Sequence, residues 1–464
     1  MNVSRQRIWL LAVALATGVL SALTVTLVLA APQRFIPYGV TNLSQTIDLD
    51  SYFSDIAVSP DGDRVVVVWP ETYEDGERAK GSVWLRWASE STGSSWSERV
   101  RVFQGSADSC AYWAAVAVSG STAHVAYVVW SPCSASITKT IYHQTYEMGG
   151  TLGPRNEITS SALSSGDIGF TKVDLALDAQ GDPHFVYTYY PPTPGTGFIY
   201  YLANHGTQEL VSEGGDYCHN PAIAWADGYA HVVWKDDTDS ESPEIRYRRR
   251  SNTAWQSSTL LSNMQAHHPN NPDVAAFGGQ VVVTWGQKHE PSANQYIVVY
   301  KRYDSAVGWL SVREVGTDRE LTSTVPMHTY TSTTAGEALF EYTSLLRPSV
   351  GLDGAGKPAV VWHVNRGIGS ADYDIMYTQA ESVTMSGIAW LTPTVINPSG
   401  QSHSASPMVA VAPVISPTLH VVYLQYDATE DNWETYYIGH KSDSSNDTLV
   451  FLPIIRRDPT AGGM

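Results

Sequence analysis

The sequence predicts an all-β protein that folds as a single β-propeller with seven blades of four strands each. One short motif carries this prediction, because it occurs seven times: an aliphatic residue, then Ala or Gly, then usually another apolar residue. A Trp or Tyr follows the small residue after ten to thirteen positions. A repeat of this size is one supersecondary unit that cannot bury a face alone, so seven copies predict a closed ring.

The motif forms the first strand of each predicted blade. Its copies are Ile56–Val58, Val116–Val118, Leu175–Leu177, Ile223–Trp225, Val274–Ala276, Val350–Leu352 and Val409–Val411. Turn residues such as Asp61-Gly62 and Asp227-Gly228 come next, so each repeat opens with a β-hairpin. The second strand of the hairpin ends in an aromatic residue: Trp69, Trp130, Tyr187, Trp234, Trp285, Trp362 or Tyr423.

Two further strands complete each repeat. Successive small residues lie 60, 59, 48, 51, 76 and 59 positions apart, which leaves room for four strands. A third run is rich in Tyr and Ile, and a fourth often starts with Trp, as at Trp96, Trp255, Trp309 and Trp390. Ala or Gly suits the innermost strands of a propeller, because these strands converge on the axis. A β-sandwich would need alternating strands but no sevenfold register.

The N-terminal segment, residues 1–31, predicts export. Arg5 and Arg7 precede the apolar run Ile8–Ala30, which is typical of a signal peptide cleaved before Ala31. The run is also long enough to span a bilayer, so an uncleaved anchor is the alternative. In both cases we expect the propeller to be extracellular, secreted or membrane-anchored, with this segment as its one membrane contact.

The propeller is predicted to occupy residues 40–446. We expect residues 40–48 to complete the seventh blade beside Tyr436–His440, because this closure removes two exposed sheet edges. The interval Thr317–Ser344 has no strand period and predicts a loop across one mouth of the ring. Residues 447–464 form a last strand or a tail, which resembles the tail of exported proteins of some filamentous bacteria.

The charge of the chain argues against nucleic acid as a partner. The net charge is −18, and removing residues 1–31 with their two arginines and no acids takes it to −20. A surface this acidic repels phosphate backbones. The basic run Arg246–Arg250 falls in a predicted third strand, whose alternation would place its arginines on two faces. We therefore interpret this run as a solvated outer strand.

The three cysteines predict one disulfide. Cys110 precedes the first strand of the second repeat, and Cys133 follows the end of its hairpin partner. These ends are neighbours in an antiparallel pair, so the two sulfurs can meet. Cys218 has no such mate, and no paired spacing typical of a zinc site occurs.

The segment Ser89–Trp96 resembles the Asp-box, or BNR, repeat of sialidase-like propellers. That repeat reads Ser-x-Asp-x-Gly-x-x-Trp, and this segment keeps the Ser, Gly and Trp but has Ser91 where the acid belongs. Arg250–Trp255 and Asp304–Trp309 are more degenerate copies. In that family the box stabilises a turn between outer strands, so the resemblance implies a fold and does not imply an activity.

A sialidase would need more than the repeats. The family holds a carboxylate with three arginines on separate blades, and uses a Tyr–Glu pair with an Asp acid/base on six blades. Here Arg347 and Arg366 are placed to reach the axial mouth, but the sequence singles out no third arginine. The family's usual landmark is an Arg followed by an aliphatic residue and Pro near the first blade. The segment Arg34–Pro37 has similar residues in the wrong order.

Candidate binding residues lie in the loops that enter the first strand and in those that join the second to the third, where propellers bind ligands. Several blades offer an imidazole, an aromatic ring or a guanidinium there: Tyr112, Tyr217, His219, His268, His289, His363, Arg366 and His403. The alternative is that each satisfies strand ends and channel water. The acidic run Asp236–Glu241 is a candidate calcium site, with a solvated loop as the alternative, and no other cofactor is expected.

These observations predict a monomeric, exported propeller that acts as a binding or scaffold module for a carbohydrate or protein ligand. The alternative is a sialidase-like glycoside hydrolase acting at the axial mouth. A hydrolase would need two carboxyls, or a Tyr–Glu pair and an acid, within reach of one sugar ring. The sequence supplies many acids but no motif that selects such a pair.

Overall fold

The computed structural model describes most of the predicted propeller. The described residues are 37–45, 49–72, 74–75, 77–78, 81–89, 95–106, 108–132, 137–163, 172–191, 196–212, 217–239, 243–251, 253–262, 268–288, 296–316, 346–365, 373–397, 403–414, 418–427 and 432–441. All of them belong to one unit, Phe35–Met464, and the other unit, Met1–Arg34, lies outside them. The predicted leader, the loop Thr317–Ser344 and the tail from residue 447 also lie outside. No helix within the described ranges is long and apolar enough to cross a membrane.

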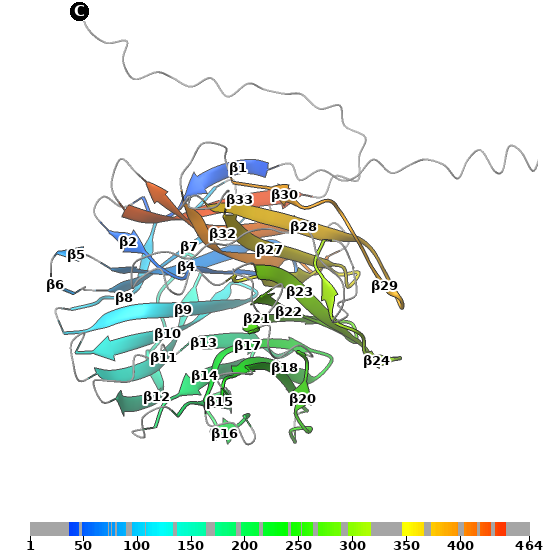
Figure 1. Ribbon diagram of the computed structural model, residues 1–464. Coiled ribbons are helices and arrows are strands. Elements are labelled where there is room, and N and C mark those ends of the chain that lie inside the picture. Colours follow the sequence, from blue (N-terminus) through cyan, green and yellow to red (C-terminus); the bar gives the residue numbers. More distant parts are fainter. Residues whose placement is uncertain are drawn as a thin grey trace, which may run out of the picture. The chain divides into compact units, whose positions relative to one another are not determined.

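The described chain is all-β, and its strands form seven antiparallel sheets of four or five strands, one for each predicted repeat (Figure 1). The first blade contains β2 (Asp50–Ser51), β3 (Asp55–Val58), β4 (Val65–Thr72), β7 (Ser82–Ala88) and β8 (Val100–Phe103). The second contains β9 (Cys110–Ser119), β10 (Thr122–Ser131), β11 (Ile137–Glu147) and β12 (Asn156–Leu163). A small hairpin of β5 (Glu74–Asp75) and β6 (Glu77–Arg78) lies between β4 and β7.

The next three blades follow the same order from the innermost strand outward. The third contains β13 (Val173–Leu177), β14 (Pro183–Tyr189), β15 (Phe198–Ala203) and β16 (Glu209–Leu210). The fourth contains β17 (Cys218–Ala226), β18 (Tyr229–Asp236), β19 (Glu244–Arg250) and β20 (Thr259–Leu260). The fifth contains β21 (Asn270–Phe277), β22 (Gln280–Lys288), β23 (Tyr296–Asp304), β24 (Gly308–Trp309) and β25 (Arg313–Glu314).

The last two blades complete the propeller. The sixth contains β26 (Ser349–Leu352), β27 (Pro358–Asn365), β28 (Tyr373–Thr384), β29 (Gly387–Trp390) and β30 (Thr394–Val395). The seventh contains β31 (Ser404–Val411), β32 (Thr418–Asp427), β33 (Asn432–Lys441) and β1 (Pro37–Asn42). The predicted fold, seven blades built on four strands, is therefore confirmed.

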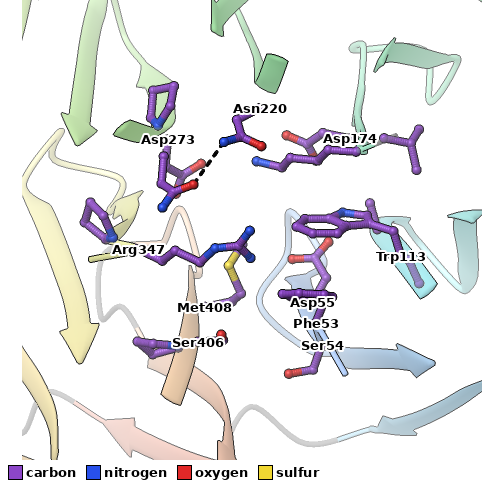
Figure 2. Close-up of a pocket in the computed structure, with 18 residues that line it drawn as sticks. Phe53, Ser54, Asp55, Trp113, Asp174, Asn220, Asp273, Arg347, Ser406 and Met408 are labelled. Atoms are coloured by element: carbon purple, nitrogen blue, oxygen red, sulfur yellow. Dashed lines mark hydrogen bonds between the residues drawn. The ribbon is translucent and has the colours of Figure 1, made fainter. Parts of the chain in front are cut away.

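The innermost strands form a closed ring. In chain order β3, β9, β13, β17, β21, β26 and β31 each contact the next, and β31 contacts β3 again. The ends at which these strands enter the sheets surround a central pocket, which we call the axial pocket (Figure 2). The repeat therefore delivers one segment from every blade to the same place.

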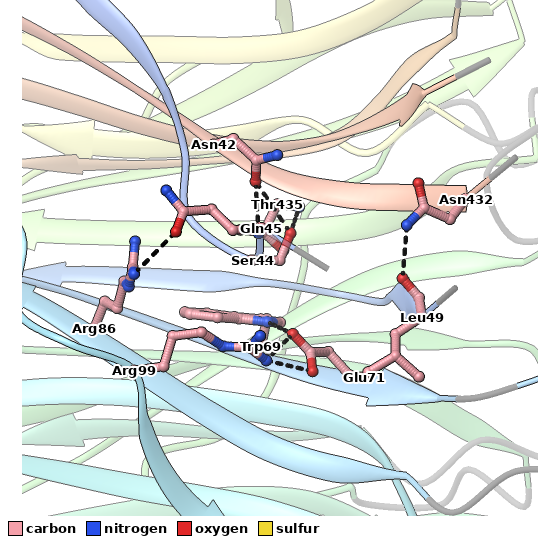
Figure 3. Close-up of polar contacts among 10 residues, drawn as sticks. All are labelled: Asn42, Ser44, Gln45, Leu49, Trp69, Glu71, Arg86, Arg99, Asn432 and Thr435. Atoms are coloured by element: carbon pink, nitrogen blue, oxygen red, sulfur yellow. Dashed lines mark hydrogen bonds and ion pairs between the residues drawn. The ribbon is translucent and has the colours of Figure 1, made fainter. Parts of the chain in front are cut away.

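The seventh blade joins the two ends of the described chain. β1 pairs with β33, with Asn42 opposite Tyr436. Beyond β1, the Leu43 nitrogen donates to the Thr435 carbonyl at 2.8 Å. The Thr435 nitrogen donates to Ser44 Oγ at 2.9 Å (Figure 3). The predicted closure is confirmed, although the strand begins at residue 37 rather than near 40.

The core lies between neighbouring blades. The seven aromatic residues that end the second strands are all buried, and Trp69, Trp234 and Trp285 are completely so. Trp69 Nε1 also donates to Glu71 at 2.7 Å, and Arg99 pairs with the same carboxylate at 2.5 Å (Figure 3). The fold thus buries the indole ring while satisfying its polar atom.

The tryptophans that start the outer strands join one blade to the one before it. Trp255 lies edge-on to Tyr201 with ring centroids 5.2 Å apart, and its Nε1 donates to Glu209 at 2.8 Å. Trp309 meets Tyr247 in the same way at 4.8 Å. Edge-to-face aromatic contacts stabilise such a junction. The Asp-box-like segments therefore contribute packing between blades.

The arginine-rich strand β19 differs from its prediction. Arg248 is buried, and its guanidinium donates to the carbonyls of Gln256 at 2.7 Å and Val211 at 2.9 Å. Arg250 pairs with Glu209 of the preceding blade at 2.6 Å. The prediction of a solvated strand is wrong for Arg248, because backbone carbonyls of two blades replace water around its charge.

The cysteines are consistent with an oxidised protein. Cys110 is disulfide-bonded, whereas Cys218 carries a free, buried thiol. Cys133 lies outside the described residues, so its predicted pairing with Cys110 stays a prediction.

Candidate functional site

The axial pocket is built from one repeat position. The residue three places before the aliphatic residue of the motif lines it in every blade, and the seven residues are Phe53, Trp113, Lys172, Asn220, Asn271, Arg347 and Ser406. We call these residues the ring-of-seven. Because the innermost strands converge on the axis, equivalent positions on seven blades meet at one site. Successive side chains that are 48 to 76 positions apart in sequence are thus gathered into a single pocket.

An aromatic pair forms one wall of the pocket. Phe53 and Trp113, from the first and second blades, are stacked with ring centroids 4.5 Å apart. The Arg347 guanidinium lies 4.8 Å from the Phe53 ring and 5.0 Å from the Trp113 ring, and Figure 2 shows it directed across the pocket toward them. Lys172 Nζ lies 5.8 Å from Trp113. Two cations therefore face the aromatic wall at cation–π distance.

Amide groups occupy the opposite blades. Asn220 Nδ2 donates to Asn271 Oδ1 at 3.1 Å (Figure 2). Asn271 Nδ2 in turn donates to the Leu346 carbonyl at 3.4 Å. This chain of amides links the fourth, fifth and sixth blades. It gives the pocket both donors and acceptors beside the aromatic wall.

Four of the ring-of-seven have a left-handed backbone conformation. Their φ angles are +34° at Phe53, +54° at Asn220, +48° at Asn271 and +48° at Ser406. In β17, β21 and β31 the pairing register shifts around this position, which marks a β-bulge. Bulges re-aim side chains, and residues other than glycine in this region are uncommon outside functional sites. The repeat thus turns these side chains toward the axis at a cost in backbone strain.

Three aspartates lie two residues further along, in alternate blades. Asp55 Oδ2 accepts the Val116 N–H at 2.8 Å, Asp174 Oδ2 accepts the Ile223 N–H at 2.9 Å, and Asp273 Oδ2 accepts the Val350 N–H at 2.9 Å. Each acceptor belongs to one blade and each donor to the next. The carboxyls therefore connect blades one to two, three to four and five to six at the axial pocket.

The surroundings of these carboxyls give Asp55 and Asp174 different pKa values. Burial, with the nearby Asp174 and Asp273 charges, raises the pKa of Asp55 to about 8. Burial raises the pKa of Asp174 to about 6, opposed by the charge of Lys172. Burial also raises the pKa of Asp273 and lowers that of Lys172. Near pH 7 the pocket thus holds a protonated Asp55 beside an ionised Asp174.

This pair has the protonation states of an acid and a base, but its hydrogen bonds are structural. Asp174 uses Oδ1 for the N–H of Leu175 and Oδ2 for that of Ile223. A carboxylate with both oxygens held by backbone groups is a poor nucleophile. The pocket is also small, with room of about 60 Å³, which corresponds to roughly four water molecules. The geometry therefore favours recognition of a small polar group over bond cleavage.

None of the predicted binding residues that the structure describes lines the axial pocket. Tyr112 packs on Trp130 with ring centroids 4.3 Å apart. Tyr217 lies 5.3 Å from His219, whose Nε2 is 3.4 Å from Asp237. Burial lowers the pKa of His219 despite that carboxylate. These three residues interact within their own blades.

The other candidates are dispersed. His363 is completely buried and meets the Tyr373 ring edge-on at 5.7 Å. His403 contacts the rings of Tyr426 and Trp433. His268 has a φ of +47° at the start of the fifth blade. His289 and Arg366 lie outside the described residues. A role in binding for the eight residues stays a prediction, and the structure brings Tyr217 and His219 together.

Sequence reasoning and the axial pocket point to the same end of the blades but select different side chains. Of the residues named for the sialidase comparison, Arg347 does line the axial pocket. The signal for the other members was present in the repeat, because each lies at a fixed offset from the motif. Reading three positions upstream of every copy would have selected all seven.

In the part of the acidic run that the structure describes, two carboxylates form ion pairs with basic side chains. Asp236 lies 3.0 Å from Arg246 Nε, and Asp237 lies 2.8 Å from Lys235 Nζ. Within the described ranges no group of three His, Cys, Asp or Glu residues is arranged to hold a metal ion. Ser240 and Glu241 fall outside those ranges, so calcium stays a prediction.

Comparison with known proteins gives structural likenesses only. No family model matches the chain, and no curated protein matches it. Among solved structures, a neuraminidase-like protein of A/flat-faced bat/Peru is similar over 91% of this chain and 97% of its own, with 10% identity and a TM-score of 0.45. The phage phi92 endosialidase is similar over 93% of this chain and 72% of its own, with 8% identity and a TM-score of 0.47.

An α-L-arabinofuranosidase from Fusarium graminearum is also similar, over 71% of this chain and 93% of its own, with 12% identity and a TM-score of 0.43. The number of blades and their order are given by the sheet topology of this chain itself.

Proposed function

We propose that this chain is an exported binding module that recognises the end of a carbohydrate in the axial pocket. One observation carries the proposal: all seven blades contribute the same repeat position to one small pocket with an aromatic wall and a polar remainder. Sugars present apolar faces, which pack on aromatic rings, and hydroxyls, which need paired donors and acceptors. Phe53 and Trp113 supply the aromatic surface for the apolar face. Asn220, Asn271 and Lys172 supply polar groups for the hydroxyls.

A glycan array tests this proposal, with the full chain as the probe. We expect binding to a defined set of glycans that falls at least tenfold in Trp113→Ala. Met385→Ala is the matched control, because Met385 is 60% exposed on an outer hairpin away from the axis. A failure to bind any glycan, with the fold intact, would overturn the carbohydrate proposal and favour a protein ligand.

A glycoside hydrolase is the second candidate, and the difference in pKa between Asp55 and Asp174 is the observation that supports it. A panel of fluorogenic glycosides separates the two. Turnover that disappears in Asp55→Asn, while binding persists, would establish hydrolysis. Binding without turnover by the unmodified chain supports the binding module.

A further inference from the structure

A larger pocket lies on the opposite face of the propeller, between the fourth and fifth blades. Its lining includes Asp227 and Gly279 from the β17–β18 and β21–β22 turns, Tyr229 and Gln280 at the starts of β18 and β22, and Arg249 and Tyr303 from the third strands. These turns follow the innermost strands, whereas the axial pocket surrounds their beginnings. We call this second site the turn-face pocket. Its volume is about 390 Å³, within the range of roughly 300 to 1,000 Å³ that is typical of small-molecule sites.

A guanidinium between two tyrosines organises the turn-face pocket. Arg249 Cζ lies 5.0 Å from the Tyr229 ring and 5.4 Å from the Tyr303 ring, which belong to different blades. Arg249 Nε donates to Gln256 at 2.6 Å, and Nη1 lies 3.5 Å from the Tyr303 hydroxyl. Among the described residues Nη2 has no hydrogen-bond partner. The rings hold the guanidinium in place and leave one of its amino groups available to a ligand.

Gln280 supplies a second unused polar group. Its Oε1 is buried and has no hydrogen-bond partner within the described structure. The backbone of Gly356 packs against this amide, because a Cβ placed there would lie 3.2 Å from Gln280 Cδ. An unpaired buried acceptor destabilises the fold, so its retention in a pocket wall calls for a partner from outside.

Asp227 gives the pocket a carboxylate to balance Arg249. Its side chain accepts the Gly279 N–H across the blade junction. His231 and Ser305 also line the pocket, and burial lowers the pKa of His231 to about 4, so one cation and one carboxylate remain as its charges near pH 7. A pocket with these two charges, an amide, an imidazole and a hydroxyl does not select an anion, and the net charge of −18 disfavours an anion further. Neutral polyols match this set, because each hydroxyl both donates and accepts, and the edges of Tyr229 and Tyr303 offer apolar contact.

We propose that the turn-face pocket is a second binding site, and that its ligand is a neutral saccharide. The Arg249 guanidinium donates to hydroxyls of the sugar, Gln280 Oε1 and the Asp227 carboxylate accept from them, and the two tyrosines border the sugar. The inference does not rest on the function proposed for the axial pocket, since the two sites share no residue.

Saturation-transfer difference NMR on the full chain tests this site, with maltose, cellobiose, lactose and mannobiose as probes. The experiment starts from Trp113→Ala, in which the axial pocket is impaired. We expect transfer to at least one disaccharide to persist there, and its apparent affinity to fall at least tenfold when Arg249→Met is added. Methionine keeps an unbranched stem between the two rings, so the blade junction is preserved.

Gln280→Leu gives an independent second variant. It removes an unpaired buried acceptor, so it should leave the melting temperature unchanged or raise it while weakening saccharide binding. The proposal is overturned if no disaccharide shows transfer in Trp113→Ala. It is equally overturned if neither added substitution changes the transfer.

Discussion

Asp55 in the first blade accepts a hydrogen bond from the backbone nitrogen of Val116 in the second, across 2.8 Å. Asp174 and Asp273 repeat this relationship two and four blades further on. The same three carboxyls line the axial pocket, so the polar groups that join blades also form the floor of the candidate site. Stability and the proposed recognition therefore depend on the same three carboxyls.

Asp55→Ala is expected to destabilise the propeller by about 1 to 3 kcal/mol, because it leaves the Val116 N–H buried without an acceptor. Asp55→Asn is the matched control. Its amide oxygen can accept the same hydrogen bond, and the native carboxyl is already largely neutral at pH 7. Urea denaturation measures both variants. Equal losses for Ala and Asn would show that the interblade hydrogen bond is not what Asp55 contributes.

The pH dependence of the Asp55→Asn variant gives a second test. The folded-state pKa of Asp55 is about 8 and its ordinary value is 3.8, so the unfolded chain releases this proton first as pH rises. Asp55 therefore lowers the stability of the native protein progressively between about pH 4 and pH 8. We expect the stability of Asp55→Asn, relative to the native chain, to increase across that interval. Parallel profiles would contradict the raised pKa.

A histidine cluster at the junction of the second and third blades predicts acid sensitivity. His143 Nδ1 lies 2.9 Å from His205 Nε2, and the His124 ring stacks on His143 at 5.3 Å. Burial, followed by the two neighbouring imidazoles, lowers the pKa of His143 to about 3. The unfolded chain thus binds this proton first as pH falls below 6.5, and stability is lost between about pH 6.5 and pH 3.

The repeat itself supplies a control variant for this cluster. In three other blades the residue equivalent to His143 is a tyrosine that hydrogen-bonds a histidine on the adjacent strand, as Tyr247 does with His231 at 2.7 Å. His143→Tyr should therefore fold. It should lose less stability than the native chain on acidification, by up to about 1.4 kcal/mol per pH unit. Denaturation midpoints at pH 7, 6, 5 and 4 measure the difference, and identical slopes would exclude His143 as the cause.

Cys110→Ser tests the disulfide. Removing a bridge that closes a loop of about 20 residues is expected to cost on the order of 3 kcal/mol. The melting temperature should fall, and a reducing agent should lower that of the native chain but not that of the variant. Mass spectrometry of a non-reduced digest identifies the partner of Cys110, and a partner other than Cys133 would contradict the predicted pairing.

The fold could be predicted from the sequence because the residues that define it are those that pack. Ala57 and its equivalents lie on the crowded innermost strands, and Trp69 and its equivalents are buried between blades. Packing restricts residue type, so a periodic pattern of small and aromatic residues survives in the sequence. The prediction that Arg248 is solvated was wrong because alternation predicts only on which face of a strand a side chain lies. It does not predict whether another blade covers that face.

The candidate site was less accessible to the same reasoning. The prediction selected loop residues by type, favouring imidazoles such as His219, and those side chains pair within their own blades. The axial pocket is defined by register instead, since one repeat position holds Phe53 in one blade, Lys172 in another and Ser406 in a third. Because the residue type at this position differs from blade to blade, no repeated residue type marks it in the sequence. The fold nevertheless brings the seven side chains into one pocket.

The pairing of β1 with β33 has a consequence for the order in which the protein can be completed. The first described strand of the chain has its partner in the last one, so Asn42 must wait for Tyr436 to be synthesised. At about 5 to 20 residues per second, those roughly 400 residues take on the order of 20 to 80 s. Until then the growing propeller is an open arc with a free sheet edge at each end. The ring therefore becomes a folded unit only at the end of synthesis.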